Sequence, residues 1–280
     1  MTLKPMQPEE VVNLDAWPIA DAGDPRRAAL VRRLREDLDT KQYCVLPQFI
    51  TESAIARTIA DVHSVFEQGY RNHSYRNCYL YKEGDPGQPA EHPSNIFFDA
   101  SYRMIAHDVL SESIPIKTMY FWPKMIGFIE DVVGTKPLYP SADPFQPVNV
   151  VCYEAGDSSA WHFDSTSPFT MTLMLQSAQS GGEFEIVPNT RKQDDPMPEE
   201  VAKVLRGDRS RLKVVPREPG ALVIFRGCNS LHRVSEIAGE RLRLMSVFVY
   251  EDRPGVIGDP GVNETVYGPR TRQVTGSRPV

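Results

Sequence analysis

The sequence is short of cysteine and has no paired cysteine motif. Its 280 residues include four cysteines, Cys44, Cys78, Cys152 and Cys228, and no two of them are spaced as C-x-x-C. In a chain this long, four scattered cysteines without a C-x-x-C pair indicate neither a disulfide framework nor a zinc knuckle. Because the cysteines lie mostly in or beside apolar runs, we expect small buried thiols in a reducing, cytoplasmic compartment.

Long apolar runs and an excess of basic residues are also missing. No run approaches the roughly 18 apolar residues of a membrane span, and no basic segment followed by an apolar one opens the sequence as in a secretory signal. Lys and Arg number 31 against 37 Asp and Glu, which gives a net charge of −6. We therefore expect a globular protein with neither a nucleic-acid partner nor a membrane contact.

The first half of the sequence is predicted to be mostly helical. Residues 24–42 have Asp24 as a helix N-cap, Pro25 at the first helical position and apolar residues at helical spacing. Residues 51–70 form a second amphipathic pattern, and residues 113–134 a third that is interrupted at Pro123. Between them, residues 71–103 are polar, aromatic and rich in turn residues, which predicts an irregular loop.

The second half is predicted to consist of short antiparallel strands. Six β-rich runs are punctuated by glycine and proline, at 148–156, 169–176, 182–188, 211–216, 221–227 and 241–250. This texture indicates a sandwich, barrel or jelly roll. We predict an α+β fold that is mainly β with helical additions: one domain over 1–280, with a mostly helical region at 1–140, a β core at 145–252 and a Gly/Pro-rich tail at 253–280 that either hugs the surface or is partly disordered.

The stretch SAWHFDSTSPFTMTLML (159–175) sets a histidine and an aspartate two residues apart. Residues i and i+2 of a strand share one face, so His162 and Asp164 point to the same place. His232 is the other histidine of the strand-rich half and directly follows an apolar strand. Two histidines and one carboxylate that leave open positions are the ligands of non-haem Fe(II) oxygenases. The same three residues also suit zinc.

Two arginines open the last apolar strand. Arg241 and Arg243 are two residues apart and so share a strand face. An arginine that turns inward needs an anion, and its planar guanidinium matches a carboxylate in bidentate geometry. In the alternative, the strand lies at a sheet edge and both arginines face solvent.

His162, Asp164, His232 and Arg241 in this order resemble the signature of the Fe(II)/2-oxoglutarate-dependent dioxygenases. Residues 145–270 are similar to the branch that contains free-amino-acid hydroxylases and halogenases. The resemblance implies a double-stranded β-helix (a cupin-like jelly roll), with Fe(II) on the first three residues and the far carboxylate of 2-oxoglutarate on Arg241. It also implies reaction with O2 to give succinate, CO2 and removal of a substrate hydrogen.

The resemblance makes Tyr153 and Arg243 further candidates for binding 2-oxoglutarate, although Tyr153 alone reads equally well as a half-buried strand residue. In the related halogenases a small residue replaces the metal carboxylate. Asp164 therefore predicts hydroxylation, with desaturation or oxidative cyclisation as alternatives, and not halogenation. The implied substrate is a small molecule, an amino acid or related secondary metabolite.

Candidate substrate contacts are Ser165, Thr172, Asn95 and Arg76. Ser165 follows the metal carboxylate, and Thr172 alternates with apolar residues along its strand. Asn95 and Arg76 fall in the polar stretch, where a solvated loop is the alternative. A non-catalytic jelly-roll binding protein and a zinc hydrolase are the competing functions, and both are disfavoured because neither needs an arginine at that spacing. The sequence leaves the oligomeric state open.

Overall fold

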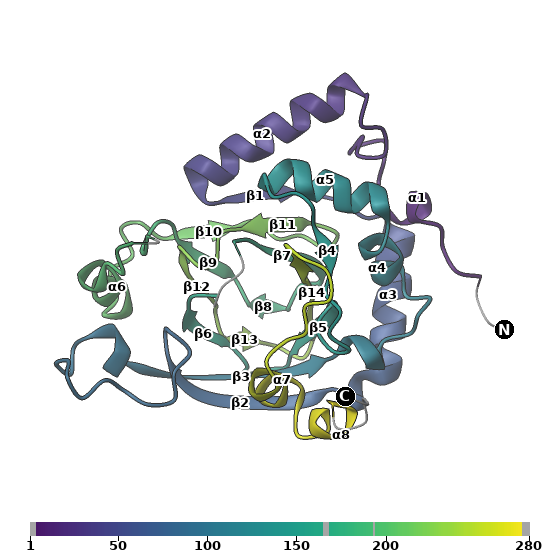
Figure 1. The fold of residues 1–280 in the computed structure, drawn as a ribbon. Helices are drawn as coiled ribbons and strands as arrows, with labels where there is room; N and C mark the ends of the chain where they lie inside the picture. Colours follow the sequence, from purple (N-terminus) through teal and green to yellow (C-terminus); the bar gives the residue numbers. More distant parts are fainter. Residues whose placement is uncertain (1–3, 165–167, 193, 276–280) are drawn as a thin grey trace.

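The computed structural model describes residues 4–164, 168–192 and 194–275, and its core is two facing β-sheets (Figure 1). The larger sheet has seven strands in the order β1 (Tyr43–Leu46), β11 (Leu222–Phe225), β7 (Thr170–Gln176), β14 (Arg243–Phe248), β5 (Val148–Tyr153), β3 (Phe97–Ile105) and β2 (Tyr70–Asn77). The smaller sheet has the order β10 (Lys213–Val215), β9 (Phe184–Val187), β12 (Leu231–Val234) and β6 (Ser159–His162). The pairs within both sheets are antiparallel.

Side chains along each strand of the larger sheet point alternately to its two faces. One face packs in an outer core beneath the helices, and the other in an inner core between the sheets. In β7, Met171 and Leu173 belong to the core beneath the helices, whereas Thr172 pairs with Val223 and Val247 of the core between the sheets. A strand with a period of two serves two cores in this way. The space between the sheets is where inward-facing polar side chains of several strands meet.

Helices cover the outer face of the larger sheet (Figure 1). As predicted, Asp24 caps the first long helix by accepting a hydrogen bond from the Arg26 amide. Gly134 ends the last helix of this layer at a φ of 77°. The helices of this layer are α2 (Pro25–Lys41), α3 (Glu52–Val65), α4 (Pro115–Tyr120) and α5 (Pro123–Val133).

The remaining elements are short. They are α1 (Pro8–Val11), η1 (Phe66–Gln68), η2 (Pro93–Asn95), η3 (His107–Val109), α6 (Pro198–Leu205), α7 (Pro260–Tyr267), α8 (Thr271–Thr275) and the strand pairs β4 (Tyr139–Pro140) with β15 (Tyr250–Glu251) and β8 (Ser180–Gly181) with β13 (Ile237–Ala238). No helix in the described ranges is long and apolar enough to cross a membrane.

The polar stretch 71–103 differs from its prediction. It contains most of β2 and β3, which pair from Tyr70 opposite Met104 to Asn77 opposite Phe97 and extend the larger sheet. The inward positions of β2 carry Asn72, Ser74 and Arg76 instead of apolar residues, so the usual strand signal of alternating hydrophobicity is missing.

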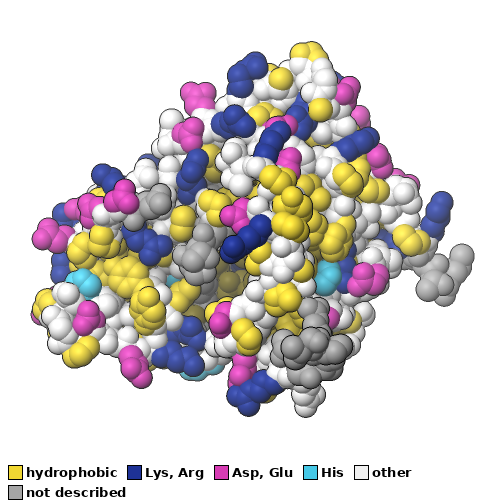
Figure 2. Space-filling model, viewed as in Figure 1, with side chains coloured by type: hydrophobic (Ala, Val, Ile, Leu, Met, Phe, Trp, Pro, Cys, Tyr) yellow, Lys and Arg dark blue, Asp and Glu magenta, His cyan; other side chains and the backbone are white. Residues whose placement is uncertain are grey.

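The connection between β2 and β3 presents hydrophobic side chains to solvent. Figure 2 shows such side chains gathered where this connection and α6 lie in Figure 1. Leu80 and Tyr81 of this connection are exposed, as is Tyr75 near the end of β2.

The C-terminal tail packs on the sheet edge. α7 lies against β2 and β3, with Tyr267 buried and the Asn263 amide donating to the buried Asp143 carboxylate. Of the two predicted states of this tail, the structure shows the surface-hugging one through Thr275. The predicted fold, an antiparallel β core with helical additions, is confirmed.

Candidate metal centre and its surroundings

The pairing of β6 with β12 brings two histidines together. His162 and His232 are direct cross-strand partners, with ring centroids 4.2 Å apart. Asp164 follows the end of β6, and its Oδ1 lies 3.7 Å from the Nε2 of His162 and 3.5 Å from the Nε2 of His232. Within the described part of the chain, these three residues are the one group of three or more His, Cys, Asp or Glu with ligand atoms within 4.8 Å of one another.

Backbone carbonyls orient both imidazoles for metal binding. The Nδ1 of His162 lies 2.8 Å from the Ala160 carbonyl oxygen, and that of His232 lies 2.9 Å from the Ser230 carbonyl oxygen. A carbonyl only accepts, so each Nδ1 carries the hydrogen and each Nε2 presents its lone pair toward Asp164. Neutral imidazole in this tautomer is the form that binds a metal.

The charge states also suit a cation. Burial and the neighbouring His232 lower the pKa of His162 to about 4. Burial raises the pKa of Asp164, but the two histidines and the Thr170 hydroxyl outweigh burial and hold it below its usual value. At neutral pH the group therefore offers a neutral His162 imidazole and an ionised Asp164 carboxylate, both of which a divalent metal can bind.

The position of Asp164 depends on a glycine. Its backbone N–H donates to the Gly227 carbonyl oxygen at 3.2 Å, and its Oδ2 accepts from the Thr170 hydroxyl. A Cβ on Gly227 would lie 1.8 Å from that Oδ2. Only glycine at position 227 therefore leaves the carboxylate where it is.

Arg243 points into the space between the sheets. It lies opposite Tyr153 in the register of β14 and β5, is 1% exposed, and its guanidinium carbon is 5.2 Å from the Tyr153 ring centroid. Its Nε donates to the Gly182 carbonyl oxygen at 3.0 Å. A Cβ on Gly182, whose φ is +74°, would lie 2.8 Å from the Arg243 Cδ, so this glycine also makes room for an arginine.

Arg241 lies elsewhere. It is exposed, and its guanidinium donates to the carbonyl oxygens of Ser177 and Ala178 at 2.9 and 2.8 Å. β14 begins at Arg243, so Arg241 precedes the strand and the two arginines do not share a strand face as the sequence suggested.

A second interior arginine, Arg217, was not predicted from the sequence. Arg217 follows β10, and its guanidinium carbon is 3.7 Å from the Phe184 ring centroid, with its Nη1 2.8 Å from the Met245 Sδ. It stands in the turn-like sequence VVPREPG, where no period or spacing marks an inward residue. Only the packing of three strands around it reveals its place.

The predicted substrate contacts have different surroundings. Thr172 is buried in the inner core, and its Oγ1 is one of the buried oxygens for which the described residues provide no partner. Arg76 lies opposite Phe98 and donates to the Leu80 carbonyl oxygen at 3.0 Å. The Asn95 amide ties its own loop together by bonds to the backbone of residues 85, 88 and 89. Ser165 lies outside the described residues.

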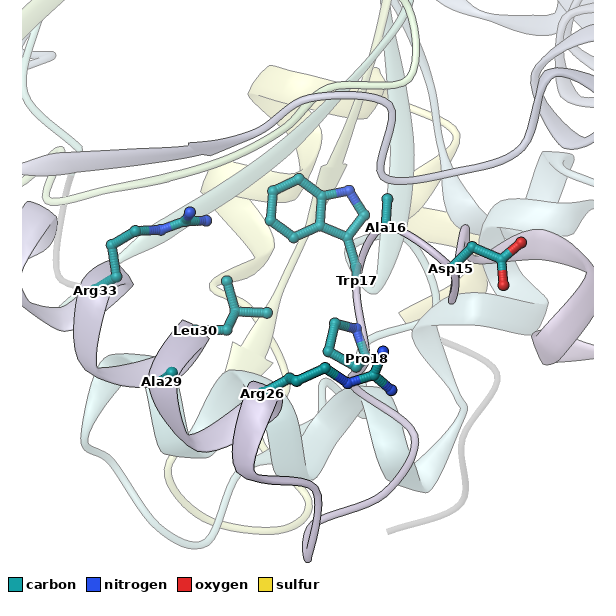
Figure 3. A pocket seen from close by; sticks show the side chains of 8 residues that line it. All are labelled: Asp15, Ala16, Trp17, Pro18, Arg26, Ala29, Leu30 and Arg33. Carbon is teal, nitrogen blue, oxygen red and sulfur yellow. The ribbon is translucent and has the colours of Figure 1, made fainter.

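A separate hollow lies at the outer helical layer (Figure 3). It is lined by Trp17, Pro18 and Leu30, among others, with Arg26 and Arg33 of α2 at its sides. The Trp17 indole N–H donates to the Pro47 carbonyl oxygen, and Arg26 forms an ion pair with Asp24. Its lining includes one carboxylate, Asp15, but no histidine or cysteine, so this hollow lacks the imidazole ligands of the inner site.

Comparison with known proteins links this geometry to a family. The sequence profile of a family described as Halogenase D matches residues 26–256. No curated protein sequence matches the chain.

Solved structures with a similar fold include SnoN, an epimerase solved with Fe3+, alpha ketoglutarate and nogalamycin RO. It has a TM-score of 0.56 and 17% identity, over 83% of this chain and 93% of that one. AviO1 from Streptomyces viridochromogenes Tue57 has a TM-score of 0.53 and 18% identity, over 82% and 96%. HygX from Streptomyces hygroscopicus, solved with nickel, 2-oxoglutarate and hygromycin B, has a TM-score of 0.52 and 17% identity, over 78% and 86%.

These matches confirm the predicted jelly roll and the predicted relation to the Fe(II)/2-oxoglutarate oxygenases and their halogenases. The predicted cofactors, iron and 2-oxoglutarate, agree with the ligands named for SnoN. The described residues fit them: two imidazoles and a carboxylate suit Fe(II), and a buried, unpaired arginine suits a carboxylate.

The Gly227 contact predicts that Gly227→Ala displaces Asp164 and weakens metal binding about 10- to 100-fold, the usual effect of disturbing a group that orients a ligand. Titration of the metal-free protein with Fe(II) or Co(II) measures this affinity. Gly127→Ala is the matched control, because a Cβ on Gly127 meets no atom within 4 Å. Wild-type metal affinity in Gly227→Ala would contradict the role of this contact.

Proposed function

We propose that this chain, which belongs to the Halogenase D family, uses Fe(II), 2-oxoglutarate and O2 on a small molecule, an amino acid or a related metabolite, and that the Asp164 carboxylate makes the outcome hydroxylation instead of halogenation. The observation that carries the proposal is the complete set His162, Asp164 and His232, with a carboxylate in place, in the same inner space as Arg243. When bound, iron and 2-oxoglutarate supply O2 activation and hydrogen abstraction.

The chain's residues would divide the binding work. His162 and His232 would offer their Nε2 atoms to the metal, and Asp164 would offer one carboxylate charge. We assign the far carboxylate of 2-oxoglutarate to Arg243 because it is buried and points inward, whereas Arg241 is exposed and its guanidinium is engaged by backbone carbonyls. The Tyr153 ring beside the Arg243 guanidinium holds its plane in place.

Asp164 also directs the outcome toward hydroxylation. Its carboxylate fills the position that related halogenases leave to a halide by using a small residue there. The Thr170 hydroxyl donates to this carboxylate, and the Gly227 carbonyl oxygen accepts from the backbone N–H of Asp164, so both contacts fix its position. Desaturation or cyclisation uses the same residues and differs only in what becomes of the substrate radical.

The inner face of the barrel offers polar groups to a substrate. The Thr172 hydroxyl is buried without a partner in the described structure, and Arg76 lies on the inner side of the β2–β3 hairpin. A hydroxyl and a guanidinium suit the carboxylate and polar groups of an amino acid. The small-molecule ligands named for SnoN and HygX support a small-molecule substrate.

The function predicts O2-dependent release of succinate in a screen of amino acids and small metabolites with Fe(II) and 2-oxoglutarate. Mass analysis of the product should show a gain of one oxygen atom. Loss of two hydrogens would indicate desaturation or cyclisation instead. A chlorinated product from the wild-type protein in chloride buffer would contradict the role given to Asp164.

The choice between the two arginines predicts that Arg243→Met raises the KM for 2-oxoglutarate about 100-fold, because it removes the partner of a buried carboxylate. Arg241→Met is the matched control and should leave this KM within about twofold. The KM is obtained from succinate release at saturating substrate. The reverse ranking of the two variants would return the assignment to Arg241.

A further inference from the structure

Arg217 and Arg243 converge inside the jelly roll. The Met245 Sδ lies 2.8 Å from the Nη1 of Arg217 and 3.9 Å from both terminal nitrogens of Arg243. Met245 and Arg243 are two residues apart on β14 and share its inner face. The two guanidinium groups therefore border the same space, although Arg217 comes from the segment after β10 in the opposite sheet.

Neither guanidinium has a counter-ion among the described residues. The ion pairs within this part of the chain include neither Arg217 nor Arg243, and the Nε and Nη2 of Arg217 are buried without a hydrogen-bond partner. Glu183 acts on Arg243 electrostatically, but its carboxylate accepts from the Ser235 hydroxyl. Two buried like charges without an anion are costly.

The unfavourable environment of Arg217 lowers the pKa of its guanidinium. Burial, reinforced by the like charge of Arg243, lowers its pKa well below the usual arginine value. Aromatic rings hold its plane, since the Phe184 and Phe225 ring centroids are 3.7 and 5.8 Å from its guanidinium carbon. A ring face compensates a buried charge only in part.

The same rings connect the arginines to the metal centre. Phe184 and Phe225 lie 5.6 and 5.0 Å from the His232 ring, centroid to centroid. The unpaired N–H groups of Arg217 therefore belong to the same inner space as the metal ligands.

We propose that Arg217 is a second anchor for the far carboxylate of 2-oxoglutarate, so that this carboxylate lies between two guanidinium groups instead of on one. The proposal rests on the proposed function, because it requires the co-substrate to occupy this space. One carboxylate has about four lone-pair positions, enough to accept from both arginines. Succinate has the same far carboxylate without the keto group, so it should depend on Arg217 as well.

The test is a calorimetric titration of the Zn(II)-loaded protein, which binds but does not turn over, with 2-oxoglutarate and with succinate. Arg217→Met should weaken both ligands about 10-fold or more, the loss expected for a charge-assisted hydrogen bond. Arg217→Lys keeps the charge and should weaken them less. Arg209→Met is the control, because Arg209 lies 5.5 Å from the Trp161 ring centroid, outside the inner core.

Thermal unfolding separates anchoring from packing. If Arg217 is an anchor, Arg217→Met should melt no lower than the wild type without ligand, since it removes an unpaired buried charge, and should lose most of the ligand-induced rise in Tm. A lower Tm with wild-type affinity for both ligands would overturn the proposal.

Arg243→Met identifies which claim has failed. Loss of binding in Arg243→Met with unchanged binding in Arg217→Met refutes the second anchor alone. Unchanged binding in both variants refutes the co-substrate site of the proposed function.

Discussion

The antiparallel pairing of β6 with β12 is the constraint on which the site depends. It sets His162 directly opposite His232, and the turn of the chain after β6 adds Asp164 to the same place. The carbonyls of Ala160 and Ser230, two residues before each histidine, fix the tautomers. A shift of one residue in this register would turn one imidazole out of the inner space, so the metal centre and the strand register are one feature.

Charged side chains at the two ends of the inner space of the jelly roll are not neutralised by other groups of the described residues. One end carries a carboxylate between two imidazoles, and the other carries Arg243 and Arg217. A divalent cation would complete the first end, and under the proposed function a dicarboxylate bound to that cation would complete the second. Two glycines make this arrangement possible, since Gly227 and Gly182 leave the room that Asp164 and Arg243 occupy. The buried charge is thus tolerated for the sake of binding.

The candidate metal ligands could be predicted from the local sequence. A period of two placed His162 and Asp164 together, and the apolar strand before His232 gave a third candidate. Three other features depend on contacts between distant segments, so local sequence patterns could not predict them. The inward arginine is set by where β14 begins, Arg217 is marked by no local pattern, and the β2–β3 hairpin carries polar residues on its inner side, so alternating hydrophobicity does not reveal it.

The central claim is that His162, Asp164 and His232 hold iron in a form that accepts 2-oxoglutarate. Anaerobic titration of the metal-free protein with Fe(II) and then 2-oxoglutarate tests it without knowledge of the substrate. The account predicts a weak visible charge-transfer band in the wild type that is absent in His162→Ala and in His232→Ala. No band in the wild type, or an equal band without either histidine, would contradict it.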